Sequence, residues 1–398
     1  MKIDMFSHVI PQKYIDAFEK NNERGIPFSK ISGDAQLLGG PGISDPVKRV
    51  EVMERYEDYA QVLVPICEVF EPVVNPKDAA RLATLYNNAL AEWFEKYPKK
   101  FVGAAATIPL NNIDAALKEI ERVITQLGFK GIVLHTPVVQ YDESWPIEKG
   151  TNFAATKALD FPEFWPIYEA MSKYNYPIWI HPHGLGGTPF YKGETRGKYM
   201  LWHIFGWPIE TMMAMSRLVC SGVLAKYPNL RFITHHCGSM IVPGLASRIG
   251  EEFDRFVYSG ELDWAKLGQG ETFKVLKPLD YYKMFYGDTA LYGGTDALEC
   301  GLKFFGPERI VFGTDFPMDM HQGTKFLDWG IEAVNKMNIR EDIYFRIQDF
   351  IREDCPVVPL YFRGNIDAVK VSVANYQPNP TPSGNLWNAW QWGFVAAK

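Results

Sequence analysis

The sequence predicts an α/β protein folded as a (β/α)8 TIM-type barrel, and three observations support this. Short apolar segments alternate eight times with segments of helical spacing, which is typical of a parallel sheet covered by helices. The segment Ile178–Ile180 is apolar throughout, as in a strand buried on both faces. Several of these segments end in a polar residue, and barrels place their active sites at the carboxyl ends of their strands.

The expected strands and helices can be placed from these patterns. The strands are Lys2–Phe6, Gln61–Pro65, Phe101–Thr107, Gly131–His135, Ile178–His181, Leu230–Thr234, one that contains Met284–Tyr286, and Arg309–Thr314. The main helices are Asp45–Tyr59, with Ser44 or Asp45 as its cap, Asn75–Tyr97, Asn112–Leu127, Phe161–Tyr174 and Pro208–Lys226. An open doubly wound sheet is the competing topology, but no Gly-rich phosphate fingerprint follows the first strand. Residues 137–157 read as an irregular loop that is too long for a connector, and this predicts a lid or pocket wall.

Composition limits the function classes. The 398 residues are 47% hydrophobic and 14% aromatic, which supplies a large core and excludes a disordered protein. The net charge is −6 and the basic residues are scattered, so neither nucleic acid nor an anionic membrane is expected as a partner. Five widely spaced cysteines without a CxxC pair favour reduced thiols. With no bilayer-spanning run and no room for a signal peptide, we expect a soluble, cytoplasmic protein.

Polar residues follow four of the expected strands. They are His8, His181, the pair His235 and His236, and Asp315. Imidazoles and a carboxylate from different strands can share one divalent ion, and Zn²⁺ with an open coordination position is the usual product. A lone histidine is more often structural, but four polar ends on separate buried strands favour a functional site.

Four motifs resemble a known family. Asp4 with His8–Pro11, Ile180–Pro182, His236–Gly238 and Phe312–Pro317 are similar to the amidohydrolase-2 (aminocarboxymuconate-semialdehyde decarboxylase-like) branch of the amidohydrolase superfamily. The resemblance covers about Met1–Phe345. It implies a (β/α)8 barrel that holds one divalent ion, Zn²⁺ first and Mn²⁺ second, and that is often a homodimer.

The resemblance also implies residue roles. His8, His181 and Asp315 would be metal ligands, and His236 would act on the substrate or its activating water, with Asp315 as the other catalytic group. Arg248 would pair with a substrate carboxylate. For His135, which ends the fourth strand, two roles stay open, one in lining the pocket and one that is structural. Because neighbours on a strand point to opposite sides, only one of the pair can face the pocket, and the His-x-Gly spacing indicates His236 and not His235.

One departure from the family weakens the metal prediction. Phe6 stands where the family usually has His or Glu, two residues before His8, and a phenyl ring cannot bind Zn²⁺. Three protein ligands and a water still make a catalytic zinc site, so a metal remains the expectation, while a site without metal stays open. His183 could substitute by proximity, although a loop hydrogen bond is the alternative, and Glu68 is a weaker candidate.

The last fifty residues depart from the family altogether. No expected barrel helix follows Phe345, and the segment Asn385–Trp392 contains three tryptophans. This part resembles the tail of periplasmic oligopeptide-binding proteins. We therefore predict a barrel domain over residues 1–346 and an atypical tail over 347–398, joined by a fusion near Arg346 and without a function of its own.

The preferred hypothesis from the sequence is a metal-dependent carboxy-lyase that decarboxylates an aromatic or unsaturated carboxylic acid, a small-molecule substrate. The alternative is a metal-dependent hydrolase, since the same metal can activate water. A second alternative is a barrel whose metal site has decayed at Phe6 and that has no catalysis.

Overall fold

The computed structural model describes the chain in defined ranges and in two units. These ranges are residues 1–21, 27–28, 40–66, 74–140, 156–182, 191, 194, 197–259, 277–337, 373–374 and 393–394. The chain divides into Met1–Gln348 and Asp349–Lys398, close to the boundary expected near Arg346. Within the described residues of the second unit, β11 (Val373–Ala374) pairs antiparallel with β12 (Gly393–Phe394). The remaining predictions for the tail lie outside the described residues.

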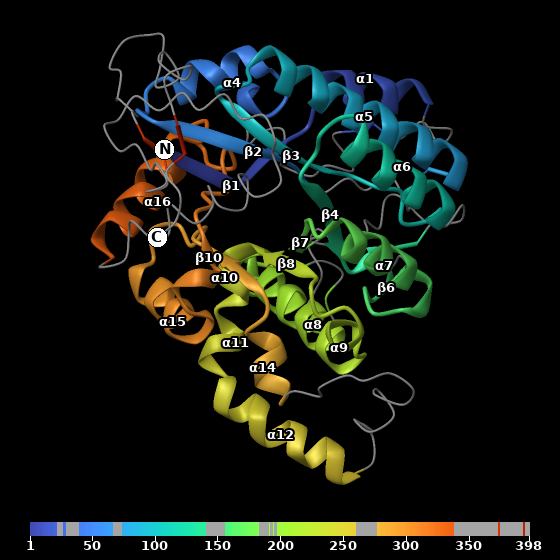
Figure 1. Ribbon diagram of the computed structural model, residues 1–398, viewed down its shortest axis with the longest axis vertical. Helices are drawn as coiled ribbons and strands as arrows, with labels where there is room; N and C mark the ends of the chain where they lie inside the picture. Colours follow the sequence, from blue (N-terminus) through green and yellow to red (C-terminus); the bar gives the residue numbers. More distant parts are fainter. Residues whose placement is uncertain are drawn as a thin grey trace. The chain divides into compact units, whose positions relative to one another are not determined.

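Eight parallel strands form the sheet of the first unit, in the order β1-β2-β3-β4-β7-β8-β9-β10 (Figure 1). They are β1 (Lys2–Val9), β2 (Tyr59–Pro65), β3 (Phe101–Ala106), β4 (Gly131–Thr136), β7 (Pro177–Pro182), β8 (Arg231–Thr234), β9 (Tyr286–Asp288) and β10 (Ile310–Val311). Each strand pairs in parallel with the next. The predicted eight-stranded α/β fold is confirmed.

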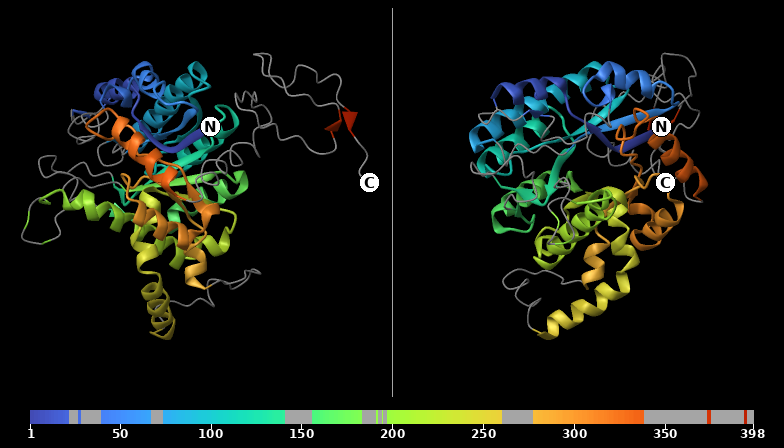
Figure 2. Two further views of the ribbon diagram at one scale, coloured as in Figure 1. Left: turned by 90° about the vertical axis from the view of Figure 1, so that its left-hand side faces the viewer. Right: turned by 180° about the vertical axis from the view of Figure 1, so that it is seen from behind.

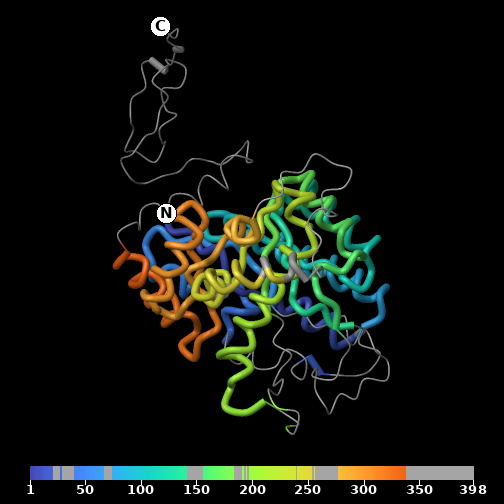
Figure 3. Tube along the Cα trace, turned by 90° about the horizontal axis from the view of Figure 1, so that it is seen from below, coloured from blue at the N-terminus to red at the C-terminus, as the bar shows by residue number. Residues whose placement is uncertain are grey.

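The sheet closes because the residues after β10 bond to β1. The amide of Met5 donates to Phe312 O at 2.8 Å, and the amide of Asp315 donates to Phe6 O at 3.0 Å. Ser7 and Phe316 form a parallel bridge. Figure 3 shows the blue start of the chain beside orange residues from the last part of the barrel. The first and last strands of the barrel are therefore neighbours.

Most of the helices surround the barrel, and α12 (Ala246–Ser259) extends away from it (Figures 1 and 2). The longer ones are α1 (Gln12–Asn21), α4 (Pro46–Met53), α5 (Pro76–Lys96), α6 (Ile113–Thr125), α7 (Trp165–Tyr174), α8 (Trp207–Cys220), α12 (Ala246–Ser259), α15 (Thr295–Phe305) and α16 (Thr324–Lys336). Short helices are α9 (Val223–Lys226), α10 (His235–Ser239), α11 (Ile241–Gly244), α14 (Pro278–Tyr282), η1 (Pro41–Ile43), η4 (Pro162–Phe164), the π-helix η5 (Trp202–Gly206) and η6 (Pro307–Arg309). No helix among the described residues is long and apolar enough to cross a bilayer.

Local capping explains why several helix starts could be predicted. Asp45 accepts a hydrogen bond from the Val47 amide at 2.8 Å, and a proline follows it at the first helical position. The side chains of Asn75 and Asn112 likewise accept backbone amides at the starts of α5 and α6. The expected helix Pro208–Lys226 is instead two helices, because Gly222 adopts a left-handed conformation with φ of 85°.

The predictions for two segments were wrong. The seventh strand, β9, runs from Tyr286 to Asp288 and not through Met284, so its carboxyl end carries Asp288. Residues 137–157 are not irregular where they are described, since β5 (Val138–Val139) pairs with β6 (Thr156–Lys157). The rest of that segment lies outside the described residues, and the lid stays a prediction.

A buried carboxylate ties the two ends of the barrel together. Asp4 Oδ1 accepts from the amides of Phe6 and Thr314, each at 3.1 Å. Its Oδ2 accepts from the Tyr59 hydroxyl at 2.7 Å and from the Thr314 hydroxyl. The residue is fully buried. Because the amide of Asp315 follows directly on Thr314, this network sets the position of the polar residue at that end of the barrel.

Candidate functional site

The predicted strand-end residues lie together inside the barrel. His8 is near the end of β1 and His181 near the end of β7, and both are fully buried. The rings of His8 and His181 have centroids 4.8 Å apart. His181 Nδ1 lies 2.6 Å from Pro182 O, so this nitrogen carries the proton and Nε2 carries the lone pair.

Asp315 stands between the histidines. Its Oδ1 is 3.0 Å from His8 Nε2 and 3.2 Å from His235 Nε2. Its Oδ2 accepts a hydrogen bond from the Tyr292 hydroxyl at 3.1 Å. Asp315 has φ of 66°, an uncommon value for a residue with a side chain. Such strain is typical of functional positions, where the surrounding structure enforces it.

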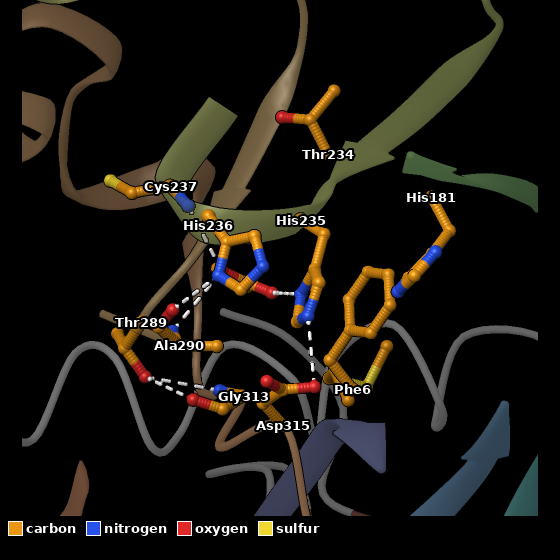
Figure 4. Close-up of polar contacts among 12 residues, drawn as sticks. Phe6, His181, Thr234, His235, His236, Cys237, Thr289, Ala290, Gly313 and Asp315 are labelled. Carbon is orange, nitrogen blue, oxygen red and sulfur yellow. Dashed lines mark hydrogen bonds and ion pairs between the residues drawn. The ribbon is translucent and has the colours of Figure 1, made fainter. Parts of the chain in front are cut away.

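His235 is held by a second carboxylate. Asp288 Oδ2 lies 2.5 Å from His235 Nδ1, and Figure 4 shows His235 between this contact and Asp315. Asp288 Oδ1 accepts from the amides of Cys237 at 3.0 Å and Ala290 at 3.1 Å. One carboxylate therefore orients the imidazole and also fixes the turn that follows β8.

Both histidines of the pair reach the site, which corrects the prediction that only His236 does. β8 ends at Thr234, and His236, Cys237 and Gly238 have φ of 57°, 55° and 63°. Strand alternation does not apply to this turn. A Cβ on Gly238 would lie 2.6 Å from the Phe305 ring, so only glycine fits there. Ligand atoms of His235, His236 and Asp315 lie within 4.8 Å of one another.

The charged groups of the site shift one another's pKa. Burial lowers the pKa of His235, but Asp288 and Asp315 outweigh it and raise this pKa to about 9. Burial and then His235 lower the pKa of His236 to about 4. For Asp315, burial acts to raise the pKa, but His235 and His8 together hold it well below its usual range. Asp315 is therefore an anion and His236 a neutral imidazole near neutral pH.

Phe6 lies inside the cluster. Its ring stacks on His235, with centroids 3.9 Å apart and planes inclined by 20° (Figure 4). It meets His8 edge-on, with ring centroids 5.5 Å apart. Phe6, which stands where the resemblance places a ligand, thus supports His235 through packing.

The remaining candidates are placed as follows. His135 is buried, and its ring centroid lies 5.7 Å from that of His181, so it adjoins the cluster. Arg248 is not brought to the cluster, because its exposed side chain lies on α12 and faces Glu252 at 3.8 Å. His183 and Glu68 lie outside the described residues.

Sequence reasoning named His235 or His236 for the cluster and then preferred His236, and it missed Asp288 and Tyr292. Asp288 is the last residue of β9, just as Asp315 follows β10. The same strand-end pattern would have indicated Asp288 if β9 had been placed correctly. Tyr292 had no such signal, because it lies beyond a strand end in an irregular segment.

The donor set fits a divalent metal ion. Two groups in the described residues could hold one, His8 with His181 and His235, and His235 with His236 and Asp315. Imidazole and carboxylate are the usual ligands of catalytic zinc and of related ions.

The closed barrel and the buried imidazole–carboxylate cluster at its carboxyl rim define a metal-site barrel of the amidohydrolase type. The chain belongs to the Amidohydrolase family (Amidohydro_2), which matches residues 4–344. It is 24% identical over 330 residues to a 2-amino-3-carboxymuconate-6-semialdehyde decarboxylase of Dictyostelium discoideum, covering 80% of this chain and 82% of the relative. It is 25% identical over 275 residues to a gamma-resorcylate decarboxylase of Polaromonas sp., covering 68% and 77%.

Solved structures show the same fold. A dihydroxybenzoic acid decarboxylase from Polaromonas sp., with bound manganese and the inhibitor 2-nitroresorcinol, superposes with a TM-score of 0.66 at 21% identity and covers 91% of this chain and 99% of its own. A 5-carboxyvanillate decarboxylase from Sphingomonas paucimobilis gives a TM-score of 0.67 at 21% identity and covers 87% and 96%.

Proposed function

We propose that this protein is a metal-dependent carboxy-lyase that removes CO2 from a small aromatic or unsaturated carboxylic acid. The observation that carries the proposal is the buried cluster of His8, His181, His235 and Asp315, with His236 beside it. Relatives and structural neighbours that are named decarboxylases favour this reaction over hydrolysis. The presence of four donor groups in the cluster also argues against a metal site that has decayed.

A divalent ion in this cluster would orient the oxygens of the substrate and stabilise negative charge as the C–C bond breaks. His8, His181 and Asp315 are the residues first expected to hold it. Zn²⁺ is the ion that the donor types suggest, and the manganese in the neighbouring structure makes Mn²⁺ the other ion to test. The Tyr292 hydroxyl keeps Asp315 in place through its bond to Oδ2.

His236 is the proposed proton-transfer residue. Its Nδ1 lies 2.7 Å from Ala290 O, a carbonyl that can only accept, so Nδ1 carries the proton and Nε2 carries the lone pair. It is the more exposed residue of the pair, at 7% against 0% for His235. A neutral imidazole at this position can take a proton from the substrate acid or hydroxyl and return it to the carbon that loses CO2. Asp315 is the second proposed catalytic group.

Two further residues are proposed to meet the substrate. His135 adjoins His181 and would line the pocket next to the metal site. Arg248 is proposed to pair with a substrate carboxylate, although in the single chain its exposed side chain faces Glu252. Substitution of each by Gln should raise KM more than it lowers kcat, because neither residue takes part in bond cleavage.

The test is a direct assay for CO2. Metal-free protein, reconstituted with Mn²⁺ or Zn²⁺, is incubated with hydroxybenzoates, methoxy-hydroxybenzoates and unsaturated dicarboxylates, and CO2 is measured. Release from at least one aromatic or unsaturated acid, dependent on the metal, is expected. Turnover of esters or amides alone would favour the hydrolase, and metal binding without turnover of either class would contradict the enzyme proposal.

We also propose that the chain forms a homodimer through the exposed apolar side chains of η5 and α8. Met200, Ile204, Phe205, Ile209 and Met213 are exposed along this segment, which projects from the first unit (Figures 2 and 3). Large exposed apolar patches mark interaction sites. Phe205→Glu should convert the dimer to a monomer in light scattering, while Lys173→Glu on α7 should not.

A further inference from the structure

His235 is fixed on several sides by its neighbours. Its Nδ1 faces the Asp288 carboxylate at 2.5 Å, its face packs on Phe6, and the residue is fully buried. Because Nδ1 is engaged by Asp288, Nε2 is the nitrogen directed at the cluster, and it lies 3.2 Å from Asp315 Oδ1. A carboxylate behind the far nitrogen is the usual partner of a histidine that binds a metal, since it sets the tautomer and orientation of the ring.

The spacing of the donors supports the same role. Ligand atoms of His8, His181 and His235 lie within 4.8 Å of one another. Asp315 Oδ1 lies 3.0 Å from His8 Nε2 and 3.2 Å from His235 Nε2. Two atoms bound to one Zn²⁺ at about 2.1 Å and a tetrahedral angle are about 3.4 Å apart. The separations from Asp315 to both imidazoles are therefore those of ligands that share an ion.

His236 has a different environment. Its Nδ1 meets the neutral carbonyl of Ala290 and no carboxylate. Ligand atoms of His236 lie within 4.8 Å of those of His235 and Asp315. The group that contains His8 and His181 includes His235 and not His236. His235 is therefore a member of the group with His8 and His181, and His236 lies beside that group.

We propose that His235 is itself a metal ligand. Three imidazoles, His8, His181 and His235, and the Asp315 carboxylate then hold one divalent ion, with Asp288 as the outer partner of His235. Phe6 does not take a ligand's place in this arrangement. It packs on the ring that supplies the third nitrogen. The inference rests on the proposed function only because both require a metal in this cluster.

Affinity for Mn²⁺ tests the assignment. Free Mn²⁺ is measured by electron paramagnetic resonance during titration of metal-free parent, His235→Gln, Asp288→Asn and the control His236→Gln. Asp288→Asn should weaken binding on the order of 10–100-fold, as expected for an outer partner. His235→Gln should weaken it further, and His236→Gln should bind as the parent does. Parent-like binding by folded His235→Gln, or a larger loss in His236→Gln, would overturn the assignment.

A count of ligands keeps the test independent of folding stability. X-ray absorption of Zn²⁺-loaded protein should show three imidazoles in the parent and in His236→Gln, and two in His235→Gln. Two imidazoles in the parent would overturn the assignment whatever the affinities are. Neither measurement uses turnover, so three imidazoles without CO2 release would contradict the proposed reaction and leave the ligand assignment standing.

Discussion

The phenyl ring of Phe6 lies stacked on the imidazole of His235, with centroids 3.9 Å apart. Phe6 and His8 are on the same strand, and both rings approach His181. An apolar side chain therefore occupies the middle of a polar cluster. Its contribution is to hold the His235 imidazole in place by packing on its face.

Replacing Phe6 by His adds an imidazole at this position. We expect Phe6→His to tighten Mn²⁺ binding roughly tenfold, equivalent to about 1.4 kcal/mol, because the new ring lies next to His8 and His181. Phe6→Leu is the control, since it changes the packing without adding a donor. Thermal unfolding of each protein at increasing Mn²⁺ gives the comparison, because an ion that binds only the folded state raises its stability. Equal metal responses in the two variants would contradict the expectation.

Tyr292 should affect catalysis through Asp315. Tyr292→Phe removes the hydrogen bond to Oδ2 and keeps the ring stacked on Phe326. We expect kcat/KM to fall by roughly 3- to 10-fold, the effect of about 0.5–1.5 kcal/mol. Tyr56→Phe is matched to it, because that hydroxyl also donates to an aspartate, Asp328, which is not a member of the cluster. An equal loss in both variants would assign the effect to general stability.

His236 should make the metal-free protein sensitive to acid. Its pKa is lowered to about 4 in the folded state from an ordinary 6.5. The neutral imidazole therefore contributes stability that is present above pH 6.5 and is lost as the pH falls toward 4. Relative to His236→Gln, the parent should lose about 3 kcal/mol of unfolding free energy over this range. Urea denaturation of metal-free protein measures it, with His321→Gln as the exposed control, and a constant difference between parent and His236→Gln would refute the assignment.

Asp4 should be essential for barrel closure. Asp4→Ala leaves buried donors on Phe6, Tyr59 and Thr314 without their acceptor. We expect a loss of at least about 3 kcal/mol, since each unsatisfied group costs about 1–3 kcal/mol. Asp16→Ala on α1, whose carboxylate bonds only to exposed Gln12 in the described contacts, should change stability little. Chemical denaturation distinguishes the two, and similar losses would contradict the network.

The sequence was sufficient for the barrel and for part of the site because both depend on local patterns. His8, His181 and Asp315 could be found because each ends or follows a buried apolar strand. His235 was set aside because strand alternation was assumed beyond Thr234, where the chain in fact turns through left-handed residues. Asp288 was missed because β9 is only three residues long, and so short a strand gives a weak pattern.

Long-range packing lies beyond such patterns. The stacking of Phe6 on His235 joins residues far apart in the sequence, and nothing in the local sequence of either residue predicts it. Arg248 shows the opposite case, because a motif suggested a role that its place on α12 in the single chain does not support directly.

The most direct test of the account is metal-dependent CO2 release by the parent protein, with His8→Ala as its companion. Metal-free protein should release no CO2 from an aromatic or unsaturated acid panel, and addition of Mn²⁺ or Zn²⁺ should restore release in the parent. His8→Ala should bind the ion poorly and remain inactive, because it lacks a ligand in contact with Asp315. Equal CO2 release by the metal-free and metal-loaded parent would contradict the central claim that a metal in this cluster carries the reaction.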